Sequence, residues 1–438
     1  MRISVFGLGY VGSVTAACLA EMGHTVIGVE PNKTKVDLMN RGQSPVVESG
    51  LGERLGRLTG IGRLVATSDW EEAVENTDMA FVCVGTPSAP NGNIDLGYVE
   101  RAVAHIGSAL AKRADYFRVI IRSTVLPGSV EGSVIPALER ASGKRAGRDF
   151  GVCMNPEFLR EGTAIDDFYH PPKTVIGELD ARSGDALAEL YKGLPADTRR
   201  VSLRVAEMVK YSDNTFHALK VVFANEIGAI CKEMQIDSHQ VMEIFCVDTK
   251  LNLSPYYLKP GFAFGGSCLP KDVRALNYLA RSRDVQTPML SSILASNRQH
   301  LTSAVHSLIQ YKGRRLGFLG LSFKSGTDDL RESPLVELIE TMIGKGFDIR
   351  IFDPYVSLGK LMGANKEFIE REIPHISKLM CESAEELLDC ADVVVVGHNG
   401  QEVKSALSNI SARHVVFDLV RAMRNGVARA GEYHGICW

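Results

Sequence analysis

The sequence predicts an α/β protein in which two Rossmann-like, doubly wound domains are joined by a long central helix. Three observations indicate this fold class. A short apolar strand near the start of the chain runs into the glycine pattern Gly7-x-Gly9-x-x-Gly12. Short apolar runs alternate with amphipathic segments on both sides of the middle of the chain, as in sheets that helices cover on two faces. Between them, one helical pattern occupies residues 205–234.

The first strand, at residues 3–6, leads through the glycine turn to a helix-compatible stretch at 13–22 and a second strand at 25–29. Glycines at these positions permit a tight turn and the close approach of a pyrophosphate to the amino end of the helix. Glu30, directly after the second strand, would accept hydrogen bonds from an adenosine ribose and repel a 2′-phosphate. The pattern therefore predicts an NAD site that disfavours NADP, with a ligand-free glycine turn as the alternative.

The next apolar runs are predicted to be parallel strands that end in polar loops. The strands lie at 79–84, 118–121 and 150–153, with amphipathic helices at 96–111 and 132–141. Ligands of open α/β sheets gather at the carboxyl ends of the strands. Thr86 and Thr124, in the loops after the first two runs, are therefore candidate cofactor contacts, although a plain turn role fits their positions equally well.

The long helix predicted at 205–234 carries polar side chains at intervals that place them on one stripe. The stripe consists of Lys210, Asn214, His217 and Asn225, while apolar side chains spread around the other faces. We expect the stripe to line an occupied cleft; a solvated face between domains is the alternative. Because so apolar a helix is unsuited to the surface of a monomer, we also expect it to pack against its symmetry mate.

After a second helical stretch at 288–311, the α/β pattern returns without the glycine motif. Strands are predicted at 316–321, 349–353, 393–397 and 415–418, and a helix at 334–344. Lys324 and Arg331, in the loop and first turn after the opening strand, would pair with phosphates of a second nucleotide; ordinary surface charge is the alternative. The predicted boundaries are those of an NAD-binding part at 1–202, a central helical part at 203–312 and a second Rossmann-like part at 313–438.

The segment at 261–272 reads Gly-Phe-Ala-Phe-Gly-Gly-Ser-Cys-Leu-Pro-Lys-Asp. It sets Cys268 among glycines, with Lys271 and Asp272 close behind. A neighbouring lysine favours the thiolate, the strongest common protein nucleophile, and backbone amides beside it would stabilise an oxyanion. A buried structural cysteine is the alternative, but the dinucleotide motif far upstream favours a catalytic one.

The composition argues against several other classes of protein. A net charge of −3 gives no sign of nucleic-acid or membrane binding, and no apolar run approaches the ~18 residues of a membrane span. The nine cysteines form no C-x-x-C pair, so neither a disulfide framework nor a zinc site is indicated, and no metal is expected. The first residues already read as a strand, which leaves no room for a signal peptide. We expect a cytoplasmic protein.

Several blocks of sequence follow one another along essentially the whole chain. They are Val-Gly-Thr-Pro at 84–87, Ser-Thr-Val-Leu-Pro-Gly at 123–128, Asn-Pro-Glu-Phe-Leu-Arg-Glu-Gly at 155–162, Glu-Met-Val-Lys-Tyr at 207–211, Phe-Ala-Asn-Glu at 223–226, the Cys268 segment, Gly-Leu-Ser-Phe-Lys at 320–324 and Arg-Glu-Ser-Pro at 331–334. Together they resemble the nucleotide-sugar 6-dehydrogenases, the NAD-dependent four-electron family that includes UDP-glucose and GDP-mannose dehydrogenases. Several such blocks in the right order make the resemblance highly specific.

The resemblance implies a reaction. The C6 alcohol of the sugar is oxidised to an aldehyde, Cys268 attacks it to form a thiohemiacetal, and a second oxidation gives a thioester that water hydrolyses. Lys210 and Asn214 would stabilise the anionic oxygen, and Asp272 and Glu161 would act as the acid–base carboxylates. The implied catalytic set is Cys268, Lys210, Asn214, Asp272, Glu161 and Thr124.

The resemblance implies that residues 1–202 are the NAD-binding domain, 203–312 a dimerisation and catalytic region and 313–438 the nucleotide-sugar-binding domain. It also implies two binding sets. NAD would be bound by Gly7, Gly9, Tyr10, Val11, Gly12, Glu30, Lys35, Thr86, Thr124, Lys271 and Arg331. The nucleotide sugar would be bound by Glu161, Lys210, Asn214, His217, Asn225, Tyr256, Tyr257, Lys259, Phe262, Gly265 and Lys324. Within this set, Tyr256, Tyr257 and Lys259 would act across a dimer interface.

Two segments bear on the substrate. Residues 255–264 and the final Gly-Ile-Cys-Trp at 435–438 are similar to those of family members that oxidise GDP-mannose to GDP-mannuronate for bacterial alginate synthesis. Two positions depart from them: Glu30 stands for an Asp, and Lys259 stands for an Arg that would contact substrate bidentately. GDP-mannose is the predicted substrate of a homodimer or higher even oligomer, and UDP-glucose or another UDP-sugar is the alternative. A two-electron hydroxyacid dehydrogenase, which has no use for Cys268, and a non-enzymatic NAD sensor stay open.

Overall fold

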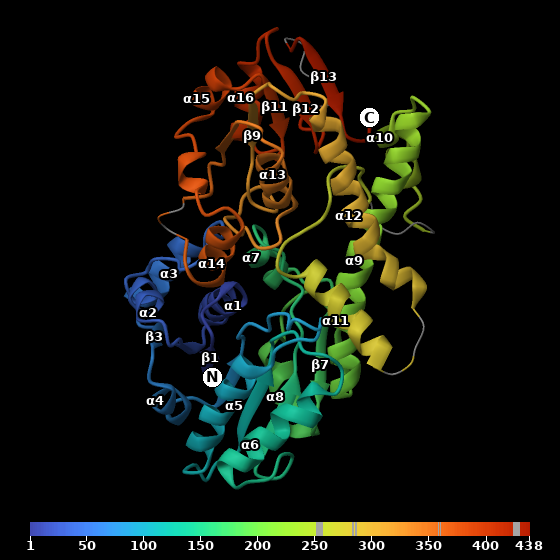
Figure 1. The fold of residues 1–438 in the computed structure, drawn as a ribbon. Helices are drawn as coiled ribbons and strands as arrows, with labels where there is room; N and C mark the ends of the chain where they lie inside the picture. Colours follow the sequence, from blue (N-terminus) through green and yellow to red (C-terminus); the bar gives the residue numbers. More distant parts are fainter. Residues whose placement is uncertain (251–256, 283, 285–286, 358, 360, 424–429) are drawn as a thin grey trace. The chain divides into compact units, whose positions relative to one another are not determined.

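The structure is a computed structural model that describes residues 1–438 except 251–256, 283, 285–286, 358, 360 and 424–429. The chain forms two compact units, Met1–Asp213 and Asn214–Trp438. Each unit has its own sheet (Figure 1). The predicted pair of Rossmann-like, doubly wound sheets is therefore present.

The first unit contains an eight-stranded sheet in the order β3-β2-β1-β4-β5-β6-β7-β8. Its strands are β1 Arg2–Phe6, β2 Thr25–Val29, β3 Leu64–Thr67, β4 Met79–Val82, β5 Phe117–Ile121, β6 Phe150–Met154, β7 Thr174–Glu178 and β8 Thr198–Val201. The first six strands have the Rossmann order, so the strand order reverses between β1 and β4, where ligands bind in such folds. The pairing of β7 with β6 is antiparallel, and the sequence did not predict β3, β7 or β8.

Helices cover both faces of this sheet, since every residue of β4 and β6 is buried. The helices are α1 Tyr10–Glu21, α2 Lys33–Asn40, α3 Leu51–Gly60, α4 Trp70–Glu75, α5 Gly97–Leu110, α6 Ile135–Ser142 with a π-helical turn Val130–Val134 before it, α7 Ala164–Tyr169 and α8 Ala181–Leu190. One apolar cluster joins β1 to α1, α3, α7 and α8, and α5 packs against α4 and α6. Each fully buried aliphatic side chain of such a cluster contributes about 1.5–3 kcal/mol to folding.

The helix α9, Leu203–Glu233, is close to its predicted extent at 31 residues. It ends where Gln235 adopts a φ of 56° and the amide of Ile236 donates to the carbonyl of Cys231 at 2.8 Å. A left-handed residue followed by such a bond closes the last turn of a helix. Within the described ranges, neither α9 nor any other helix is long and apolar enough to cross a membrane.

The second unit contains a parallel five-stranded sheet in the order β10-β9-β11-β12-β13. The strands are β9 Leu316–Leu319, β10 Ile349–Phe352, β11 Val393–Val396, β12 Val415–Asp418 and β13 Glu432–Gly435, the last of which was not predicted. The helices are α10 Ser238–Phe245, α11 Leu269–Ser282, α12 Pro288–Ile309, α13 Pro334–Gly344, α14 Gly363–Glu372, α15 Ala384–Cys390 and α16 Gln401–Ser408, with a 3-10 turn Ile376–Lys378. The predicted strands and the predicted helices at 288–311 and 334–344 are all present.

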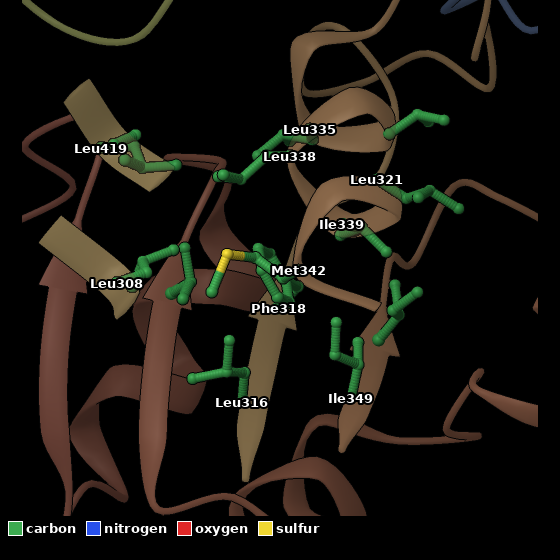
Figure 2. Packing of buried hydrophobic residues seen from close by; sticks show 14 of the residues in the cluster. Leu308, Leu316, Phe318, Leu321, Leu335, Leu338, Ile339, Met342, Ile349 and Leu419 are labelled. Atoms are coloured by element: carbon green, nitrogen blue, oxygen red, sulfur yellow. The ribbon is translucent and has the colours of Figure 1, made fainter. Parts of the chain in front are cut away.

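One apolar cluster of the second unit lies between α13 and the sheet, and another joins the sheet to α15 and α16. Figure 2 shows Leu338 and Met342 of α13 beside Phe318 of β9. Helix α13 starts at Pro334, because proline suits the first position of a helix. Arg331 lies in a turn before this helix, in the connection that follows β9, where the sequence placed it.

Candidate active site

The glycine turn between β1 and α1 has the geometry that a dinucleotide needs. Gly7 has a φ of +90°, and its amide donates to the carbonyl of Val29 at 2.8 Å. A Cβ added at Gly12 would lie 1.8 Å from the Gly7 carbonyl oxygen, so only glycine lets the helix pack this close to the turn. A Cβ at Gly9 would meet nothing within 4 Å. The turn is therefore tight at two glycines and open at the third, where a phosphate can approach.

The carboxylate of Glu30 is fixed beside this turn. Glu30 is buried, its Oε2 accepts from the amide of Leu8 at 2.9 Å, and its Oε1 accepts from the amide of Asn32 at 3.2 Å. Tyr10 and Val11 open α1, whose first turn carries no acidic side chain that would repel an anion, and Lys35 lies on α2. These residues fit NAD: a helix amino end for the pyrophosphate and a fixed carboxylate for the ribose.

The loops after β4 and β5 are joined to each other. The buried Thr86 hydroxyl donates to the carbonyl of Thr124 at 2.8 Å, and the Ser123 hydroxyl donates to the carbonyl of Val84 at 2.6 Å. Polar groups at the carboxyl ends of neighbouring strands therefore lie together. At least part of the role of Thr86 is structural, because its hydroxyl ties one loop to the other.

A buried carboxylate on α9 holds the same loop further along. Glu207 accepts from the amide of Gly128 at 2.6 Å and from the amide of Val130 at 2.8 Å, and its side chain is fully buried. The loop that carries Thr124 is thereby anchored to the helix turn that precedes Lys210. Because a buried amide without a partner costs about 1–3 kcal/mol, this anchor fixes the loop firmly.

Lys210 forms a buried ion pair with Glu157, which lies in the loop after β6. The Lys210 Nζ and the Glu157 Oε1 are 2.8 Å apart, and the two side chains are 6% and 8% exposed. Burial by itself would raise the pKa of the Glu157 carboxyl, but the Lys210 ammonium and the amide of Leu159 hold that pKa below its ordinary value. The site therefore keeps a buried cation and a buried anion side by side.

In the second unit, Cys268 directly precedes the amino end of α11. Its carbonyl accepts from the amide of Asp272 at 2.9 Å in the first helical turn. Cys268 is exposed, whereas the other eight cysteines are buried or partly buried, and all nine are free thiols. Burial raises the pKa of the thiols of Cys83 and Cys153 to about 12. Only Cys268 combines exposure with a helix amino end, which favours a negative charge.

The carboxylate of Asp272 lies one turn after Cys268 and is 1% exposed. Its Oδ2 accepts from the side-chain amide of Asn214, and its Oδ1 is 3.1 Å from the Nζ of Lys271. Asn214 in turn lies one turn after Lys210 on α9, on the same face of the helix. The structure thus brings Asn214 of α9 together with Lys271 and Asp272, which lie in the first turn of α11 directly after Cys268.

Other predicted substrate residues of this unit contact a neighbouring ring or the backbone. The rings of His217 and Tyr257 stack with centroids 4.8 Å apart, and Tyr256 lies outside the described residues. The Asn225 amide accepts from the amide of Gly261 at 3.0 Å and donates to the carbonyl of Phe262 at 3.2 Å. Asn225 therefore supports the backbone of the segment that leads to Cys268.

The remaining predicted residues lie along or near that segment. A Cβ at Gly265 would lie 2.2 Å from the carbonyl oxygen of Glu332, so this position requires glycine. Lys259 is exposed. The Arg331 guanidinium pairs with Asp329 at 2.6 Å, and Lys324 lies in the loop after β9, where its carbonyl accepts from the hydroxyl of Ser322.

Three family models of the UDP-glucose/GDP-mannose dehydrogenase family match the chain in order. The NAD binding domain matches residues 1–195, the central domain 204–299 and the UDP binding domain 317–425. The chain is also 51% identical, over 438 residues and 100% of both sequences, to the GDP-mannose 6-dehydrogenase of Pseudomonas aeruginosa. The chain belongs to the UDP-glucose/GDP-mannose dehydrogenase family. It is an NAD-dependent nucleotide-sugar dehydrogenase.

Solved structures of the family resemble the dehydrogenase over its whole length. A UDP-glucose dehydrogenase from the hyperthermophilic archaeon Pyrobaculum islandicum is 35% identical with a TM-score of 0.89, covering 100% of this chain and 98% of its own. A ternary complex of GDP-mannose dehydrogenase from Pseudomonas aeruginosa is 52% identical with a TM-score of 0.58, covering 100% of both chains. The predicted family, fold class and cofactor are thereby confirmed.

Two carboxylates that support residues of the candidate site were not predicted from the sequence. Glu157 pairs with Lys210, and Glu207 anchors the Thr124 loop. A signal existed for Glu157, because it follows a predicted strand in the same kind of polar loop as Thr86 and Thr124. No local pattern indicates that Glu207 anchors this loop, because its partner Gly128 lies 79 residues upstream.

Proposed function

We propose that the dehydrogenase oxidises GDP-mannose to GDP-mannuronate. The observation that carries this proposal is the 51% identity to the Pseudomonas aeruginosa GDP-mannose 6-dehydrogenase over the full length, against 35% to the UDP-glucose dehydrogenase of Pyrobaculum islandicum. The similarity of residues 255–264 to GDP-mannose-oxidising members supports the same substrate. By the same resemblance, the product would supply alginate synthesis in the cytoplasm.

The oxidation proceeds through a covalent bond to Cys268. NAD, when bound, accepts one hydride in each of two oxidations. After the first, the Cys268 thiolate adds to the aldehyde carbon, and the carbonyl oxygen takes up the negative charge. The second converts this thiohemiacetal to a thioester, and water then breaks the carbon–sulfur bond to release the acid and the thiol. The exposure of Cys268 at the start of α11 supports this role.

The polar groups of the site stabilise the anionic intermediate and transfer protons in this reaction. Lys210 and Asn214 donate to the anionic oxygen of the thiohemiacetal. Asp272 and Glu161 move protons in the alcohol and water steps. The contact between Asn214 and Asp272 supports a shared site for a donor and an acid–base group.

A side-by-side measurement of GDP-mannose and UDP-glucose tests the substrate. We expect kcat/KM to favour GDP-mannose by on the order of 10²-fold or more, because a site that hydrogen-bonds one base leaves its polar groups unpaired with another. NADH formation at saturating NAD measures both rates. A higher kcat/KM for UDP-glucose would reassign the substrate, and one NADH per sugar with release of a stable aldehyde or ketone would indicate a two-electron enzyme.

Cofactor choice depends on Glu30. Glu30→Ala is expected to weaken NAD binding by about 10–100-fold, because hydrogen bonds to a charged group contribute about 1.5–3 kcal/mol. The affinity for NADP should fall less, because the variant also removes the carboxylate that repels the 2′-phosphate. Titration of both cofactors measures the effect, with Asp37→Ala, an exposed acid on α2, as the matched control. Equal turnover of the parent enzyme with NAD and NADP would refute the assignment.

We also propose that the dehydrogenase is a homodimer or a higher even oligomer. Large apolar side chains are exposed on α9 and around α10, among them Phe223 at 41%, Ile244 at 75% and Val247 at 79%. Exposed apolar groups gathered on one region are typical of a protein interface. Light scattering at micromolar concentration should give an even oligomer that the double substitution Ile244→Glu and Val247→Glu weakens. Ile61→Glu, at an exposed site of the first unit, is the control, and a monomeric parent protein would contradict the proposal.

A further inference from the structure

Glu48, between α2 and α3, has a buried carboxylate that serves three donors. Its Oε2 accepts from the amide of Gly162 at 2.8 Å and from the hydroxyl of Tyr10. Its Oε1 accepts from the amide of Ala164 at 2.9 Å. The residue is only 8% exposed. A buried charge is tolerated only when hydrogen bonds satisfy it, and these donors come from two distant parts of the chain.

Those two parts carry residues of the site. Tyr10 belongs to the glycine turn, and its hydroxyl oxygen also accepts from the Gly162 amide at 2.8 Å. The amide of Gly162 belongs to the peptide bond between Gly162 and Glu161, and Glu161 is the proposed acid–base residue. Gly162 has a φ of +85°, a conformation that other residues rarely adopt. The backbone at Glu161 is therefore shaped by the glycine and held in place by Glu48.

The hydroxyl of Tyr10 acts as a donor in this arrangement. Burial, together with the hydrogen bond to Glu48, raises the pKa of Tyr10 far above its ordinary value, so the phenol keeps its proton. Glu48 thus receives donors on both oxygens. A side chain that ends in a hydrogen-bond donor on one side cannot accept hydrogen bonds from all three of these donors.

We propose that Glu48 is a positioning residue of the dehydrogenase, which sets the place of Glu161 relative to the cofactor turn. The proposal rests on the proposed acid–base role of Glu161. Glu48 joins the glycine turn, its own loop and the loop before α7 into one hydrogen-bonded group. The carboxylate that moves protons is then held at a constant place beside the nucleotide turn.

Glu48→Gln tests this with almost no change in shape. The amide nitrogen of glutamine faces an N–H or O–H donor on one side, so at least one buried donor is left unpaired. Hydrogen–deuterium exchange of the ligand-free protein should be at least about tenfold faster at residues 160–166 in the variant. With GDP-mannose, kcat should fall by about 10–100-fold, because small misplacement of a catalytic group costs this much. NAD affinity should change by less than about threefold. Glu53→Gln, an exposed acid on α3, is the matched control.

Coupling to Glu161 separates positioning from a general loss of stability. If Glu48 acts through Glu161, the double variant Glu48→Gln and Glu161→Gln should be no slower than Glu161→Gln alone. Independent, multiplicative losses would overturn the inference, as would unchanged exchange at residues 160–166. Full activity of Glu161→Gln would instead remove the proposed role of Glu161. Glu48→Asp keeps the charge but has a shorter reach, and applies the same coupling test if the glutamine variant does not fold.

Discussion

Replacing Cys268 with alanine is expected to abolish formation of the sugar acid, lowering its rate by at least about 10³-fold. In the proposed reaction two hydrides leave the same carbon, and the thiohemiacetal on Cys268 holds the aldehyde covalently, so that the second hydride leaves without release of a reactive aldehyde to water. The parent enzyme should form two NADH per sugar oxidised. Chromatography of the nucleotide products together with NADH absorbance measures both numbers. Cys390→Ala, at a partly buried thiol of the same unit, is the control and should behave as the parent.

The covalent bond itself is observable in a second variant. Asp272→Asn should slow thioester hydrolysis more than thioester formation, because Asp272 is a proposed acid–base carboxylate and its removal would leave water less activated. Intact-mass spectrometry after acid quenching should then find one GDP-mannuronyl group per chain. The adduct should be absent when Cys268→Ala is added. Full acid production by Cys268→Ala alone would end the covalent proposal and make Cys268 a structural residue.

Replacing Lys210 with methionine is expected to lower both stability and activity, for two different reasons. The free energy of unfolding should fall by about 3–5 kcal/mol, because Glu157 is left as a buried charge without its partner. The rate should fall by about 10²–10³-fold through loss of an oxyanion donor. Denaturant unfolding and steady-state kinetics measure the two effects.

The double variant Lys210→Met and Glu157→Gln separates the two effects. It should recover most of the stability, because a neutral pair has no buried charge left, yet stay inactive. Recovery of activity would show that Lys210 matters only for folding. The pH dependence has a definite sign, because the folded pKa of Glu157 lies below its ordinary value. The pair therefore stabilises the parent enzyme above that ordinary pKa, and its contribution is lost as the pH falls through the folded pKa.

Much of the fold was predictable because its signals are local. The glycine turn and the strand that directly precedes Glu30 were predicted from turn chemistry and apolar runs, and both are present. Helix α13 occupies the predicted residues 334–344, since proline and apolar spacing mark its start and its buried face. The short strand β7 was not predicted, and its antiparallel pairing with β6 depends on where the chain returns to the sheet.

The sequence by itself determined the family and the NAD cofactor and predicts Cys268 as the nucleophile, because glycine patterns and a thiol among glycines are chemical signals within a few residues. Only the tertiary structure decided which acids support the site. The contacts of Glu157, Glu207 and Glu48 were not predicted from the sequence, and all three side chains are buried. Glu48 receives the amides of Gly162 and Ala164 from 114 and 116 residues away. The hydrogen-bond partners of a buried carboxylate depend on which distant segments the fold brings together, and a local sequence pattern does not contain that information.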